Sequence, residues 1–156
     1  MKYLLLLVLT TIFTNCSPLA TYPPVEINAI AALANSSYEP IPTVIVTTIE
    51  YASTHFGGIE ETVYNLPEGV STRTYEIVGS RIPDARPVKR KGEPAYYITE
   101  LRVRGLRAQA EILFPRAGGG YETATLYLSK SFTGPWKVNR ERIWLIPNET
   151  APAPTY

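Results

Sequence analysis

The sequence predicts an α+β domain in which N-terminal helices pack on a four-stranded antiparallel β-meander. Apolar residues recur with helical spacing in the first half of the chain, and from Ala95 onward the apolar period changes to two. In addition, short connections join the strand-like segments of the second half, as in an antiparallel meander. Helices that precede such a sheet are expected to cover one of its faces.

Three helices are predicted. Residues 25–34 are predicted to form a short helix. Pro24 stands at its start, where proline suits the first helical position. Residues 43–56 contain β-branched residues that favour a strand, but their apolar residues recur at helical spacing and Gly57 can end a helix. We therefore expect a helix here, and a further one over residues 71–81.

The meander is predicted to consist of residues 95–104, 106–114, 121–132 and 135–146, with a further short strand over residues 62–66. The first hairpin is expected to turn at Arg104-Gly105 and to pair Leu101 with Ala108. This register puts the apolar residues of both strands on one face. The residues expected in the core of the hairpin are Leu101, Val103, Ala108 and Ala110. Trp136 and Trp144 are expected to share the core face of the last strand.

The order of these elements resembles the cystatin-like and nuclear-transport-factor-two-like group of α+β folds. In that group an N-terminal helix packs into a curved antiparallel sheet. The segment TGPWKVNRERIWLI, residues 133–146, looks like the closing hairpin of many exported members. The resemblance covers residues 43–146 and carries over no catalytic residue.

Residues 1–15 are predicted to be a signal peptide. Lys2 is followed by an apolar run of 11 residues, Tyr3 to Phe13, which suits an export signal and is too short to span a bilayer. No further lysine or arginine occurs before Arg73, in line with the bias that keeps positive charge on the cytoplasmic side. We therefore expect an exported protein.

Cys16, the only cysteine, directly follows this leader. Residues 13–15, Phe-Thr-Asn, resemble in part the lipobox of bacterial lipoproteins, in which the leader is cut before a cysteine that carries acyl chains. On this interpretation Cys16 is the lipidation site and residues 16–24 are its tether. Ser17 then implies passage to an outer membrane where the host has one. The alternative is ordinary signal cleavage and a protein that is secreted free.

A single domain is predicted over residues 25–146, with a disordered tail over residues 147–156. Charge is unevenly distributed along the chain. Residues 16–72 carry six glutamates and no basic residue, whereas residues 73–156 carry 14 basic and 8 acidic residues. Such asymmetry either marks a partner surface or reflects two halves that pack on each other.

No catalytic, cofactor-binding or metal-binding residue is predicted, because the inventory of reactive side chains is poor. His55 and Asp84 are the only histidine and aspartate, and no serine lies in a G-x-S-x-G context. An enzymatic or small-ligand function remains the alternative. It would need a pocket between a helix and the concave sheet, with polar groups converging around His55, Glu50 and Tyr51.

Two surfaces are predicted to bind a partner. The loop RIPDARPVKRK, residues 81–91, holds five basic residues and one acidic residue, and an anionic partner would be attracted to it. Its expected contact residues are Arg86, Lys89, Arg90 and Lys91. The exposed sheet face is the second surface, with Tyr96, Arg102 and Arg107, since tyrosine and arginine are common at interfaces. For both surfaces the alternative is an ordinary solvated face.

The leading hypothesis is therefore a non-catalytic lipoprotein domain, anchored to a membrane of the bacterial cell envelope, that binds a protein or an anionic envelope component. Nucleic acid is not an expected partner. Export would separate the protein from the nucleic acids of the cell. The basic loop also has no interleaved aromatic residues on which bases could stack.

Overall fold

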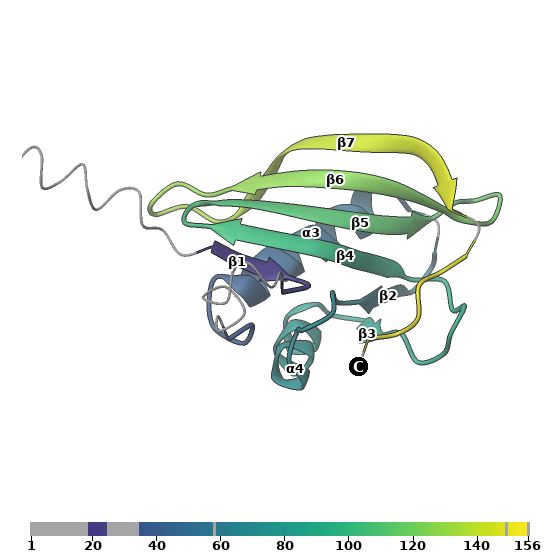
Figure 1. Cartoon of the computed structure of the whole chain (residues 1–156), viewed down its shortest axis with the longest axis horizontal. Coiled ribbons are helices and arrows are strands. Elements are labelled where there is room, and N and C mark those ends of the chain that lie inside the picture. The colour runs from purple at the N-terminus through teal and green to yellow at the C-terminus, as the bar shows by residue number, and fades with distance from the viewer. Residues whose placement is uncertain (1–18, 25–34, 58, 149, 156) are drawn as a thin grey trace, which may run out of the picture.

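The computed structural model of the chain describes residues 19–24, 35–57, 59–148 and 150–155. In chain order the elements are β1 (Leu19–Tyr22), α3 (Ile41–His55), β2 (Thr62–Asn65), α4 (Thr72–Arg81), β3 (Ala85–Pro87), β4 (Tyr96–Arg104), β5 (Arg107–Pro115), β6 (Tyr121–Ser129) and β7 (Lys137–Asn148). Figure 1 shows the long strands β4 to β7 side by side, with α3 behind them.

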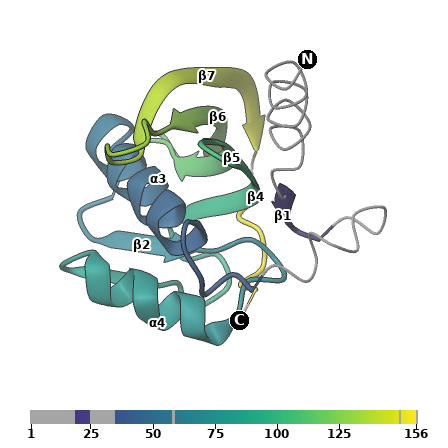
Figure 2. The same ribbon diagram turned by 90° about the vertical axis from the view of Figure 1, so that its left-hand side faces the viewer.

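The strands form one seven-stranded mixed sheet. Its order is β3-β2-β4-β5-β6-β7, and β1 also pairs with β4. Strands β4 to β7 are antiparallel neighbours, β1 runs antiparallel to β4, and β2 runs parallel to both β3 and β4. The helix α4 connects β2 to β3, because parallel neighbours need a crossover connection. In Figure 2, α3 covers one face of the sheet and α4 lies below it.

The predicted fold class is wrong beyond the level of α+β. The sheet is mixed and has seven strands, not four antiparallel ones, and the two helices of the described residues follow β1 and flank β2. The antiparallel part, β4 to β7, matches the predicted meander. The helix predicted over residues 25–34 lies outside the described residues. Strands β1 and β3 were missed because four and three residues are too few to show a period.

The helix α3 buries an apolar stripe against the sheet. Val44, Ile45, Ile49 and Ala52 have no exposed surface, and they belong to one core cluster with Leu101 and Leu126 of the sheet. The β-branched threonines of α3 do not break the helix. Thr48, for instance, satisfies its buried hydroxyl by donating to the carbonyl oxygen of Val44 at 2.8 Å. Helical spacing of the apolar residues therefore outweighed strand propensity.

The first hairpin buries the residues that the sequence predicted, with a different turn. Leu101 pairs with Ala110, Val103 pairs with Ala108, and all four side chains are buried. The turn is Gly105-Leu106, one residue later than predicted, and the positive φ of 58° at its first position suits glycine. A turn shifted by one residue moves the pairing by two positions, so each side chain stays on its predicted face.

A bulge in β4 reverses the faces of its first residues. Ile98 pairs with Ile112 and Glu100 pairs with Glu111, so Thr99 is the extra residue. Tyr96 and Ile98 therefore lie in the main core, on the side of Leu101. Tyr96 is 1% exposed and donates its hydroxyl to the carbonyl oxygen of Gly57 at 2.6 Å. Its predicted role as a contact residue on the exposed sheet face is wrong.

A second bulge separates the two tryptophans. The pairing of β6 with β7 shifts at Asn139, between Arg140 and Val138. Trp136 is buried in the main core, whereas the indole nitrogen of Trp144 donates to Thr125 Oγ1 at 2.9 Å. The expected common core face for both residues is therefore wrong, because the extra residue reverses the alternation between them.

Two segments expected to be irregular have defined contacts. Leu19–Tyr22, assigned to the tether, form β1 along β4. Of the tail, residues 147–148 end β7, and Thr155 contacts the end of β2. Its hydroxyl donates to the carbonyl oxygen of Leu66 at 2.6 Å, and its backbone N–H donates to Asn65 Oδ1 at 3.2 Å.

Thr155→Val is expected to lower the free energy of unfolding by about 1 kcal/mol, because it keeps the side-chain shape and removes the hydrogen bond to Leu66. Chemical unfolding measures the change. Thr150→Val is the matched control in the same segment, because the exposed side chain of Thr150 makes no hydrogen bond with any described residue. Equal stability of both variants would contradict a structural role for Thr155.

Candidate functional site

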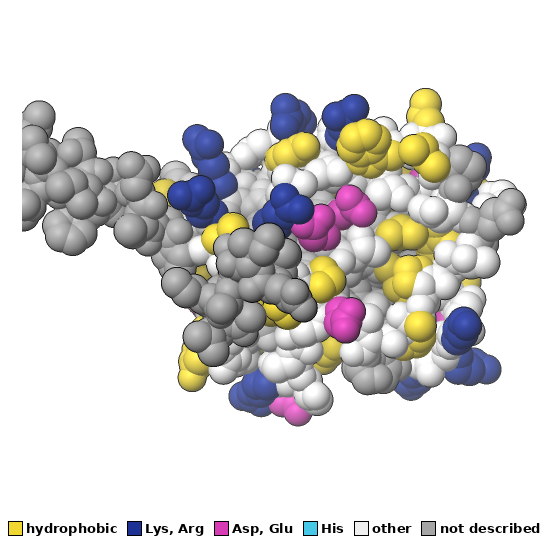
Figure 3. Space-filling view, in the orientation of Figure 1, with side chains coloured by type: hydrophobic (Ala, Val, Ile, Leu, Met, Phe, Trp, Pro, Cys, Tyr) yellow, Lys and Arg dark blue, Asp and Glu magenta, His cyan; other side chains and the backbone are white. Residues whose placement is uncertain are grey.

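The outer face of the sheet, opposite α3, carries arginines on several neighbouring strands. Arg140 of β7, Tyr127 of β6, Gln109 of β5 and Arg102 of β4 are successive cross-strand partners and form one row. Side chains of directly opposed residues on one face lie close together. In Figure 3, which looks onto this face, lysine and arginine side chains gather at the left end and along the upper edge.

A hollow of about 240 Å³ lies at the β1 end of this face. We call it the arginine groove, and it is lined by Leu19, Arg102, Arg104, Arg107, Ala108, Gln109 and Tyr127. Arg104 and Arg107 face each other across the first hairpin, next to its turn. Like charges that directly oppose each other destabilise a strand pair, so this arginine pair does not contribute to the stability of the hairpin.

Most of these guanidinium groups are not neutralised within the protein. Arg102 pairs with Glu100. Among the residues that the structure describes, Arg104 and Arg107 have no carboxylate within ion-pair distance. Both side chains are exposed, as is that of Arg102. The groove therefore presents more positive charge than the neighbouring acidic residues cancel.

Two further arginines stack on aromatic rings beside the groove. The guanidinium of Arg140 lies 4.1 Å from the ring centre of Tyr127, and that of Arg142 lies 3.9 Å from the ring centre of Trp144. Stacking on an aromatic ring covers one flat face of a guanidinium group and fixes its orientation. The N–H bonds of the guanidinium point outward in its own plane, so the ring does not block them. Both arginines remain exposed and able to donate hydrogen bonds.

Arg86 of the predicted basic loop is engaged within the protein. Its guanidinium donates to both carboxylate oxygens of Glu61, at 2.8 and 2.9 Å, and to Glu93 at 2.7 Å. The hydrogen bonds that Arg86 donates to Glu61, and then those to Glu93, raise the pKa of Arg86. Since both carboxylates already occupy its donors, Arg86 holds the loop in place and is poorly suited to bind an external anion.

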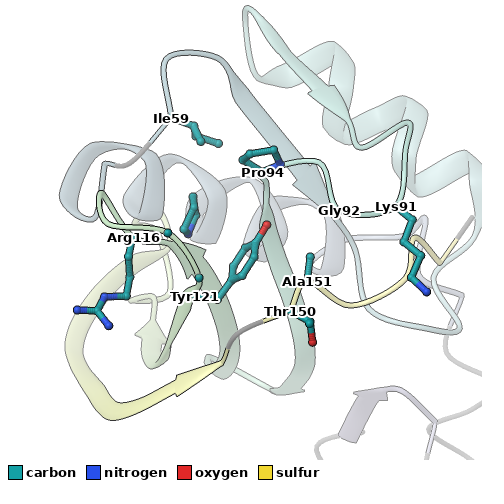
Figure 4. A pocket seen from close by; sticks show the side chains of 11 residues that line it. Ile59, Lys91, Gly92, Pro94, Arg116, Tyr121, Thr150 and Ala151 are labelled. Carbon is teal, nitrogen blue, oxygen red and sulfur yellow. The ribbon is translucent and has the colours of Figure 1, made fainter.

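The other three residues of the basic loop are exposed, and Arg90 and Lys91 line a hollow of about 400 Å³ together with the acidic Glu93. Lys89, Arg90 and Lys91 follow one another in a turn whose backbone N–H groups at positions 89 and 90 donate to Glu93. Lys91 also borders a hollow of about 480 Å³, together with Tyr121 and Arg116. In Figure 4 the charged ends of Lys91 and Arg116 point to opposite sides of this hollow. It therefore lacks the convergent cations of the arginine groove.

The residues that would support an enzymatic pocket do not converge either. His55 is exposed and stacks on Tyr51 with ring centres 3.8 Å apart, and Glu50 is exposed. The space beneath α3 is filled by the buried apolar residues of the main core. In the described part of the chain, no three or more His, Cys, Asp and Glu side chains cluster as metal ligands would.

The sequence pointed to Arg102 and Arg107, which the structure brings together, and missed Arg104, Arg140 and Arg142. Arg104 could have been found by the same alternation that revealed Arg102. Arg140 and Arg142 were obscured because the bulge at Asn139 reverses the faces of β7. Cys16 lies outside the described residues.

No family model matches the chain, and no curated protein or solved structure matches it either. Within the described residues, no helix is both long and apolar enough to cross a bilayer.

Proposed function

We propose that this protein is a non-catalytic binding domain of the bacterial cell envelope, exported by residues 1–15 and anchored through acylated Cys16. It binds an anionic envelope component through the arginine groove. The observation that carries the proposal is the convergence of Arg102, Arg104 and Arg107 on one hollow, where two of them have no carboxylate partner among the residues that the structure describes. This concentration stands out in a chain whose formal net charge is only +1.

The chemistry of the groove suits phosphate or carboxylate groups. A guanidinium offers two parallel N–H donors that match the two oxygens of such an anion. Gln109 and Tyr127 add neutral donors between the charged ones, and Arg140 lies over the same tyrosine ring. Because the face is open and broad, it suits a repeated or extended anion better than a single enclosed metabolite.

Replacing the three groove arginines by glutamine is expected to weaken binding to isolated anionic cell-wall material by about tenfold or more. The wild type should be released by added salt, because salt screens exposed charges. The change should leave the thermal unfolding midpoint nearly unchanged, since these side chains are exposed.

The matched control is Lys89→Gln, Arg90→Gln and Lys91→Gln, which removes the same charge from the basic loop. It is expected to retain most of the binding. If the loop variant lost binding and the groove variant kept it, the anion would be held by the basic loop, and the groove would not be the site.

A further inference from the structure

We infer that the anion bound by the arginine groove is the phosphate headgroup layer of the bilayer in which Cys16 is anchored, so that the outer sheet face lies on the membrane. This inference rests on the proposed function and identifies its partner. It follows from where β1 begins and from what surrounds its first residue.

The chain between the anchor and the folded domain is very short. Strand β1 begins at Leu19, so only residues 17 and 18 separate it from Cys16. Three residue steps of extended chain reach at most ~10–11 Å. The tether expected from the sequence, residues 16–24, would have allowed a much larger distance. Acylation of Cys16 therefore keeps the beginning of β1 close to the membrane surface.

The first residue of β1 belongs to the arginine groove. Leu19 lines the hollow and pairs with Arg104, and Thr21 pairs with Arg102. Arg107 opposes Arg104 on the next strand. The exposed guanidinium groups of the groove thus lie beside the first residue of β1. The attraction of basic side chains to an anionic leaflet falls off within a Debye length, ~8–10 Å, which is comparable to the reach of the linker.

The rest of the outer face carries aromatic residues and also one opposed pair of glutamates, Glu100 and Glu111, of which Glu100 pairs with Arg102. Tyr127 and Trp144 lie on it, each with an arginine stacked on its ring. Tyrosine and tryptophan prefer the headgroup region, where one side of the ring is apolar and the other is wet. With this face on the membrane, α3 lies on the side that faces away from it (Figure 2). Acyl chains together with a basic patch give more stable anchoring than one chain alone.

The test separates the groove from the acyl anchor by using the full chain with Cys16→Ser. This chain is mixed with vesicles of phosphatidylcholine, or of equal parts phosphatidylcholine and phosphatidylglycerol, and the bound fraction is measured by co-sedimentation. We expect binding to the anionic vesicles that weakens with added salt. Adding Arg102→Gln, Arg104→Gln and Arg107→Gln should reduce it by about tenfold or more. The leader contributes equally to every variant.

The control carries Lys89→Gln, Arg90→Gln and Lys91→Gln in the same Cys16→Ser chain and is expected to bind the anionic vesicles like its parent. Equal binding of the parent to both kinds of vesicle, or undiminished binding of the groove variant, would overturn the inference. Loss of cell-wall binding in the groove variant, without any vesicle binding by the parent, would also overturn it while leaving the proposed function intact. Acylation is followed separately by labelled palmitate in the chain that retains Cys16.

Discussion

Leu101→Ala is expected to lower the free energy of unfolding by about 2–5 kcal/mol. The Leu101 side chain has no exposed surface and lies in the main core on the inner face of β4. Its partners across the sheet are Ala110 of β5 and Tyr22 of β1. Ala110 is too small to fill the space that the leucine side chain would leave, and Tyr22 is held in its own strand. The neighbouring side chains therefore cannot close this space. A cavity would therefore add to the lost burial of the side chain.

Leu145→Ala provides a matched control for this change. It removes the same atoms from the edge strand β7, but Leu145 is 88% exposed. It is expected to change the free energy of unfolding by no more than about 0.5 kcal/mol. Urea unfolding of both variants measures the difference. Similar losses for the two would mean that β4 does not present Leu101 to the core, and that its register after the bulge differs from the one described.

The long strands could be predicted from the sequence because each repeats its alternation many times. Strands β5 and β6 keep a regular register over nine pairs, and their inner residues follow the predicted period. The bulges at Thr99 and Asn139 could not be predicted in this way. Each bulge inserts one residue and reverses the face of every residue beyond it. Because the prediction assumed unbroken strands, it placed Tyr96 on the wrong face of the sheet and put Trp136 and Trp144 on the same face.

The short strands depend on partners that are distant in the sequence. The pairing of β1 with β4 joins Leu19 to Arg104, and that of β2 with β3 joins Thr62 to Ala85. Neither β1 nor β3 is long enough to reveal a period of its own, and their pairing is decided by free edges of the sheet. Local periodicity alone could therefore not predict the strand order of the seven-stranded mixed sheet.

The candidate site, like the fold, could be predicted only in part from the sequence. Arg102 and Arg107 were recognised because they alternate with buried neighbours on strands whose local period is clear. Arg86 was also counted as an anion-binding residue, although Glu61 and Glu93 occupy its donors in the structure. Glu61 lies 25 positions away in the chain. A basic segment thus reveals where charge is located, but not whether a distant carboxylate has already neutralised it.

Acidification is expected to weaken the fold through Glu93. Its carboxylate accepts hydrogen bonds from Arg86 at 2.7 Å and from the backbone N–H groups of Lys89 and Arg90 at 2.7 and 3.3 Å. The bond from Arg86, followed by that from Lys89, lowers the pKa of Glu93 from its ordinary value of 4.5 to about 2. A group with a lowered pKa stabilises the folded state fully above its ordinary pKa. That contribution is lost as the pH falls from 4.5 toward about 2.

Glu93→Gln tests this expectation, because it keeps the size of the side chain and removes its charge. We expect the variant to be less stable than the wild type at neutral pH. The gap should narrow as the pH falls from 4.5 toward about 2, where the wild-type carboxylate also becomes neutral. Urea unfolding at a series of pH values measures the gap.

Glu122→Gln is the control, since Glu122 pairs at the surface with one exposed arginine, Arg116, at 3.0 Å, and its removal should cost little. A gap between Glu93→Gln and wild type that stays constant with pH would show that the ionised carboxylate of Glu93 is not what holds the loop to Arg86.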